Sequence, residues 1–130
     1  MEDYEFLDAF HEGTLPSAEF RHKGHLRLAW LVLKKHTSDE AARIISREIL
    51  KLATSQGAPG RFHETLTRFW VHMVRHAMEN GPDAKSIDQL LVSFPILLKK
   101  DLRYRHWSRG LFDSGAARNG WIPPDLSPLP

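Results

Sequence analysis

The chain has 130 residues, of which 42% are hydrophobic and 26% are charged, and its formal net charge is +2. This length accommodates one modest hydrophobic core and excludes two independent ones, and the composition is that of a globular domain. The absence of cysteine excludes disulfides, thiolate nucleophiles and thiolate metal ligands. A net charge so close to zero disfavours nucleic acid as a partner.

Neither a membrane span nor a secretion signal is visible in the sequence. The longest apolar run, LAWLVL at residues 28–33, is far shorter than the ~20 residues of a membrane-spanning helix. The first ten residues, MEDYEFLDAF, are acidic, whereas a secretory signal begins with a basic segment. We therefore expect a soluble, cytoplasmic protein without a membrane partner.

Apolar residues recur at spacings of three and four, which predicts helices and no strands. The first helix should cover residues 2–12 and end at Gly13, with four inward-facing side chains: Tyr4, Phe6, Leu7 and Phe10. The second should begin near His22. The third should be capped by Thr37, Ser38 or Asp39 and should end at Gly57. Its apolar stripe consists of Ala41, Ile44, Ile45, Ile49, Leu50 and Leu52.

The second half of the chain continues this pattern and then loses it. A long helix is predicted over residues 61–79, and a shorter one after a cap at Ser86, with a further turn starting at Pro95. From Tyr104 the periodicity fades, and the proline-rich ending GWIPPDLSPLP cannot be helical. The predicted fold is an all-α, compact bundle of four to five helices in a single domain, residues 1–130, with an extended C-terminal strap at residues 119–130. Trp121 should anchor this strap on the body of the protein or on a partner subunit.

The eight histidines can be sorted by the helix face that they occupy, because each residue of a helix advances by about 100°. In the predicted helix 61–79, His63 shares the apolar face with Leu66 and Trp70, whereas His72 and His76 fall on the opposite, solvent side. Glu64 lies at the edge of the apolar face.

In the second helix, His22 and His25 both fall on the apolar face. If the second and fourth helices pack together, then His22, His25, His63 and Glu64 converge on one buried polar spot. Each buried imidazole needs a partner, and a shared cation would satisfy all three. Neutral imidazoles with one carboxylate suit a divalent transition metal such as Zn, Fe, Mn or Ni. The competing interpretation is structural, with ring nitrogens bonded to backbone carbonyls or to a threonine hydroxyl.

The spacing of these residues argues against one class of metalloenzyme. A zincin protease needs HExxH, and in HETLT the place of the second histidine is taken by Thr67. The adjacent pair His63 and Glu64 resembles in kind the His-Asp pair of the HD phosphohydrolases, with Glu in place of Asp and without that family's further His and Asp ligands. DinB-like bundles, which bind a metal through three histidines on separate helices, are similar at the level of fold alone.

Three motifs taken together, FRHKGHLRLAW at 20–30, FHETLT at 62–67 and DLSPLP at 125–130, resemble a group of small bacterial all-helical proteins. The resemblance covers most of the chain. It implies a bacterial, cytosolic protein and no particular mechanism.

The leading hypothesis is a metal-dependent hydrolase or lyase that acts on a small polar molecule. His22, His25, His63 and Glu64 would bind the metal, and His63 and Glu64 would be catalytic, with Glu64 as ligand or general base. Thr67, Arg103 and Arg105 would position the substrate.

Two further interpretations stay open. One is an acid–base enzyme that uses His63 and Glu64 without a metal. Another is a non-enzymatic module that binds a protein or nucleic acid through the basic-aromatic segment 97–110 or through the strap. A homodimer is compatible with any of them.

Overall fold

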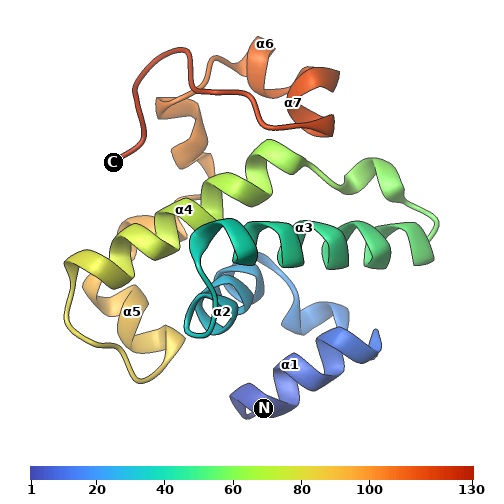
Figure 1. Ribbon diagram of the computed structural model, residues 1–130, viewed down its shortest axis with the longest axis vertical. Coiled ribbons are helices and arrows are strands. Elements are labelled where there is room, and N and C mark those ends of the chain that lie inside the picture. Colours follow the sequence, from blue (N-terminus) through green and yellow to red (C-terminus); the bar gives the residue numbers. More distant parts are fainter.

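The computed structural model describes residues 1–130 and contains helices but no strands (Figure 1). The all-α prediction is therefore confirmed. The α-helices are α1 (Asp3–Glu12), α2 (His22–Leu33), α3 (Ser38–Ser55), α4 (Glu64–Asn80), α5 (Ile87–Ser93), α6 (Arg109–Phe112) and α7 (Gly115–Asn119). Four short 3-10 helices join them: η1 (Ser17–Glu19), η2 (Pro59–Arg61), η3 (Pro95–Leu98) and η4 (Lys100–Arg105).

Helices α2, α3 and α4 pack on one another and form the centre of the molecule. Local sequence sets the ends of α3 as predicted. The hydroxyl of Thr37 accepts a hydrogen bond from the Glu40 N–H, and the Glu40 carboxylate accepts one from the Thr37 N–H, at 3.2 and 3.1 Å. This reciprocal pair satisfies two backbone donors that the first helical turn leaves free. Gly57, with φ at +72°, turns the chain away after the helix.

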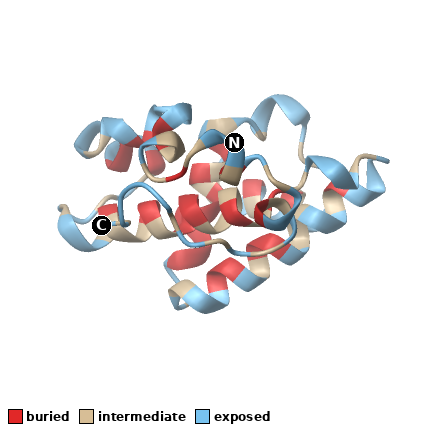
Figure 2. Cartoon of the chain, turned by 90° about the horizontal axis from the view of Figure 1, so that it is seen from above, coloured by how far each residue is buried: buried red, intermediate tan, exposed pale blue.

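The core lies where these three helices face each other, and Figure 2 shows the buried residues gathered in the middle of the molecule. Trp30 of α2 and Phe69 of α4 are almost fully enclosed there. Two residues predicted to face inward are instead exposed, Tyr4 by 68% and Leu50 by 41%. Helical geometry explains both, because Tyr4 lies two residues from the buried Phe6 and Leu50 lies five from the buried Ile45, which places each well off the buried face.

The region after Tyr104, for which no helix was predicted, contains the short helices α6 and α7. Beyond them residues 120–130 run extended over the body, as predicted for the strap (Figure 1). The indole N–H of Trp107 donates to the carbonyl of Ile122 at 2.9 Å, and the ring of Trp121 packs edge-on against Trp107. His72 donates to the main-chain oxygen of Pro130 at 2.7 Å. The strap therefore lies on its own chain.

None of the helices combines the length and the apolar character that crossing a bilayer requires.

Candidate functional site

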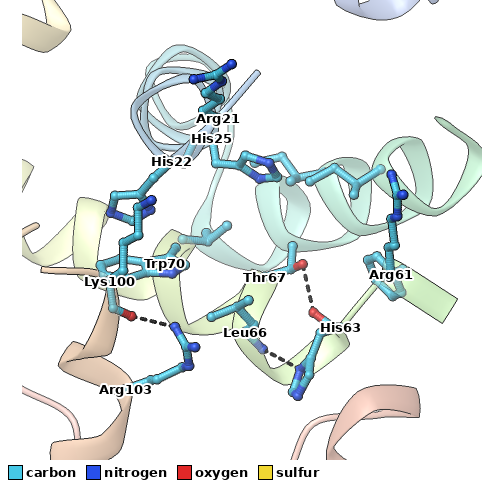
Figure 3. A pocket seen from close by; sticks show the side chains of 15 residues that line it. Arg21, His22, His25, Arg61, His63, Leu66, Thr67, Trp70, Lys100 and Arg103 are labelled. Carbon is cyan, nitrogen blue, oxygen red and sulfur yellow. Dashed lines mark hydrogen bonds between the residues drawn. The ribbon is translucent and has the colours of Figure 1, made fainter. Parts of the chain in front are cut away.

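A pocket of about 300 Å³ lies between α2, α3, α4, η2 and η4 (Figure 3). Helices α2 and α4 pack together. As a result His22, His25 and His63 all line this pocket, whereas Glu64 does not. The expected convergence of the three histidines is thus present, without the carboxylate.

Both ring nitrogens of His63 form hydrogen bonds within the protein. His63 is the N-cap of α4 and not a residue within the helix, and its Nδ1 accepts a hydrogen bond from the Leu66 N–H at 3.0 Å. Its Nε2–H donates to the carbonyl of Phe112 at 2.8 Å. Because both ring nitrogens are used, a metal could bind His63 only by breaking one of these bonds. His63 therefore fits the structural interpretation, in which the ring nitrogens of a buried histidine are bonded to the backbone.

Glu64 faces away from the pocket. Its carboxylate accepts a hydrogen bond from Nε of Arg68, one turn along α4, at 2.6 Å. This is the usual pairing of opposite charges four residues apart on a helix. Glu64 therefore lies outside the pocket in which we expected it as a ligand or general base.

His25 presents its ring to the pocket, stacked on Phe20 with ring centroids 4.0 Å apart. Neither of its ring nitrogens has a hydrogen-bond partner in the protein. Burial, with a smaller contribution from the nearby His22, lowers the pKa of His25 to about 4. His25 is consequently a neutral imidazole near pH 7, with one donor and one acceptor available to a ligand.

His22 has one of its two ring nitrogens in a hydrogen bond. Its Nε2–H donates to the carbonyl of Leu97 at 2.7 Å, so in the neutral ring Nδ1 carries the free lone pair. Burial lowers the pKa of His22, the bond to Leu97 opposes this, and the charges of Lys100 and Arg103 lower it again. No group of three or more His, Asp or Glu side chains is arranged to hold a metal ion.

The pocket is strongly cationic. Four basic side chains line it and no acidic one does: Arg21, Arg61, Lys100 and Arg103. None of the four takes part in an ion pair. Arg103 lies over the Tyr104 ring, 4.6 Å from its centroid, donates to the Lys100 carbonyl, and keeps its Nε–H buried without a partner. Unpaired cations around an apolar cavity favour an anionic ligand.

The floor of the pocket is apolar and is supplied by the central helices. Leu66 and Trp70 come from α4, and Ile45 and Ile49 come from α3. Their spacing of three or four residues places each pair on one helix face. The site can therefore hold a ligand with a hydrocarbon part as well as charge.

The three predicted substrate-binding residues are distributed unevenly. Thr67 and Arg103 line the pocket, whereas Arg105 is exposed outside it. The Thr67 hydroxyl donates to the His63 carbonyl at 2.9 Å. Arg105 follows Arg103 by two residues on the 3-10 helix η4, which points its side chain in a different direction.

Sequence reasoning missed Arg21 and Arg61, and it included Lys100 only as part of the basic segment 97–110. All three lie in short connections next to the central helices, where no apolar periodicity assigns a face. A signal was present in the sequence, since Arg21 is adjacent to His22, Arg61 lies two residues before His63, and Lys100 lies within the basic segment 97–110.

Comparisons of the chain with protein-family models, with curated proteins and with solved structures give no match.

Proposed function

We propose that the protein binds a small organic anion in this pocket. The observation that carries the proposal is that four unpaired cationic side chains and no carboxylate surround a single cavity with an apolar floor. The acidic group of the ligand would pair with the cations, and its hydrocarbon part would lie against Leu66 and Trp70.

The size and chemistry of the site support this assignment. A volume of about 300 Å³ is at the lower end of the range of small-molecule pockets. A hydrogen bond to a charged group contributes about 1.5–3 kcal/mol, and an arginine can donate two in parallel to one carboxylate or phosphate. Arg103 is the best placed of the four for such a contact, because its packing on Tyr104 and its bond to Lys100 hold the guanidinium in place.

Calorimetric titration with simple carboxylates and phosphate esters tests the proposal. Lys100→Met and Arg103→Met should each weaken binding about tenfold to a hundredfold. Arg105→Met removes the same charge from the same 3-10 helix outside the pocket, and should leave affinity nearly unchanged. Equal losses in all three variants would indicate a nonspecific charge effect and would contradict the assignment.

A second candidate function is proton transfer on the bound anion. Its support is His25, a neutral imidazole that lines the pocket and whose ring nitrogens have no hydrogen-bond partner in the protein. Such a group is deprotonated near pH 7 and can accept a proton as a weak base. This is the acid–base form of the hydrolase or lyase predicted from the sequence, with His25 in the role first given to His63 and Glu64. His25→Gln should abolish turnover while changing anion affinity by less than about tenfold.

The metal-dependent form of that prediction requires a different ligand set. His22 and His25, three residues apart on α2, have the free ring nitrogens, because those of His63 are bonded to the backbone. Elemental analysis of the wild-type protein and of His25→Ala tests it. Stoichiometric Zn, Fe, Mn or Ni that is lost in the variant would support a metal bound by these two residues and by the anion.

The non-enzymatic alternative keeps its own support, since Arg105 and part of the segment 97–110 are exposed. Capture of a protein or nucleic acid that depends on Arg105 and not on Arg103 would favour it. A cytoplasmic location, a bacterial source and a dimeric state stay predictions.

A further inference from the structure

Three of the four cations that line the pocket form two separate groups. Figure 3 shows Arg61 on one side of the cavity and Lys100 with Arg103 on the other, with Leu66 and Thr67 of α4 between them. The two groups belong to different elements, η2 and η4. A ligand with an acidic group at each end could pair with both groups.

Each group is held in place independently of the other. The guanidinium of Arg118, in α7, donates to the carbonyls of Gly60 and Phe62 at 2.6 and 3.3 Å, which fixes the backbone on either side of Arg61. On the opposite side, Arg103 donates to the carbonyl of Lys100. The backbone that carries each cationic group is therefore fixed before a ligand arrives, which reduces the entropy lost on binding.

The region between the ends carries no formal charge. Its surface is formed by Leu66 and Trp70, and His25 above it is neutral at pH 7 because burial lowers its pKa to about 4. This region can accept a short hydrocarbon chain and one uncharged polar group that hydrogen-bonds to His25.

From this arrangement we infer that the ligand is a two-ended organic anion, with acidic groups at opposite ends of a short apolar chain. The inference rests on the proposed function, that this pocket binds an anion, and adds the ligand class. One acidic group pairs with Lys100 and Arg103, and the other pairs with Arg61. Arg21, at the start of α2, adds positive charge at the rim of the pocket.

A matched ligand series tests the inference by calorimetric titration. It contains linear dicarboxylates of four to seven carbons, the monocarboxylate of each length, and the corresponding chains with a phosphonate in place of one carboxylate. The wild-type protein should bind the two-ended ligand of one preferred length about tenfold to a hundredfold more tightly than the monocarboxylate of that length. Preference for the phosphonate would assign a phosphoryl group to one end, and preference for the dicarboxylate would assign two carboxylates.

Two variants identify the ends. In Arg61→Met and in Lys100→Met the two-ended ligand should lose this advantage and bind about as weakly as the monocarboxylate. Arg105→Met should keep it. Because Arg61 and Lys100 are exposed and make no ion pair, neither substitution should alter the fold, which circular dichroism checks.

The results separate this inference from the proposed function. Equal affinity for one-ended and two-ended ligands, or an advantage that survives Arg61→Met, would overturn the two-ended ligand while leaving an anion site. No binding by any member of the series would overturn both.

Discussion

His63 donates its Nε2–H to the carbonyl oxygen of Phe112, 2.8 Å away, and the two rings stack with centroids 4.4 Å apart. This contact joins the start of α4 to α6, which lies 49 residues later in the chain. The other ring nitrogen caps α4 through the Leu66 N–H. His63, predicted from the sequence as a metal ligand and catalytic residue, thus connects two helices.

His63→Ala should therefore lower the free energy of unfolding by about 2–4 kcal/mol, because it removes the helix cap and leaves the Phe112 carbonyl without a donor. His63→Asn keeps a side-chain oxygen that can cap α4, and should recover about 1 kcal/mol of this loss. Urea unfolding followed by circular dichroism measures both. If His63→Ala kept its stability and lost a bound metal, the ligand role predicted from the sequence would replace the structural one.

The start of α4 also shows where sequence reasoning stopped. The apolar spacing from Leu66 onward predicted the helix correctly, but its first residue was placed at 61 and lies at Glu64. Histidine is not among the usual capping residues, so nothing in the sequence marked His63 as the boundary. Because the predicted helix began three residues too early, His63 was interpreted as a ligand on a helix face and not as the N-cap that it is.

Glu64 was predicted to line the site, although the sequence contained the signal that it forms a surface ion pair. An acid followed four residues later by Arg68 indicates a surface ion pair, which the structure has at 2.6 Å.

Residues on short connections, such as Arg61, could not be placed, because their position depends on tertiary contacts like the one from Arg118. The convergence of His22 and His25 with His63 was predicted only on the condition that the second and fourth helices pack together, which they do.

The stability of the protein should fall as the pH drops from 7.5 to 5. Burial lowers the pKa of His22, His25 and His63 in the folded state. Below pH 6.5 the unfolded chain then binds more protons than the folded one, so acid favours unfolding. For His25, with its pKa lowered from 6.5 to about 4, the loss by pH 5 is about 2 kcal/mol.

Urea unfolding at pH 7.5, 6.5, 5.5 and 5 checks this dependence in the wild-type protein and in His25→Gln. The variant should show a pH slope that is smaller by about the contribution of His25. His76→Gln, on the far side of α4 from the pocket, is the matched control for the loss of an imidazole elsewhere on the protein. An unchanged slope in His25→Gln would show that His25 titrates alike in the folded and unfolded chain.

Thr65 should hold the strap in place. Its hydroxyl, fully buried, donates to the carbonyl of Gly120 at 2.7 Å and accepts from the Ile122 N–H at 3.2 Å. Thr65→Val leaves both backbone groups without a partner and should cost about 1–3 kcal/mol. Hydrogen exchange of the Ile122 amide should accelerate in this variant.

Thr67→Val, two residues along the same helix, is the control for Thr65→Val. The Thr67 hydroxyl donates to the His63 carbonyl, which also accepts from the Thr67 N–H at 3.0 Å. The carbonyl keeps that bond in the variant, so the cost should stay below about 1 kcal/mol and the strap should exchange as in the wild-type protein. Faster exchange of Ile122 in both variants would mean that the strap responds to general loosening of α4.

Gly24 allows α2 to lie close against the backbone of η1, the segment before it. A methyl group added at Gly24 would lie well inside van der Waals contact of the Glu19 carbonyl oxygen. The backbone of η1 would have to move, so Gly24→Ala should cost about 1–3 kcal/mol. Gly110, in α6, has open space around it and no positive φ, so Gly110→Ala should be neutral or stabilising by up to about 1 kcal/mol.

The same substitution reaches the pocket, because the displaced segment leads directly into Arg21 and His22, which line it. Gly24→Ala should therefore weaken anion binding as well as lower the unfolding midpoint, whereas Gly110→Ala should change neither for the worse. Titration of both variants below their unfolding temperatures measures the affinity without interference from unfolding. Loss of stability with unchanged affinity would show that η1 can move without shifting Arg21, and that this end of the pocket is not positioned by the contact with Gly24.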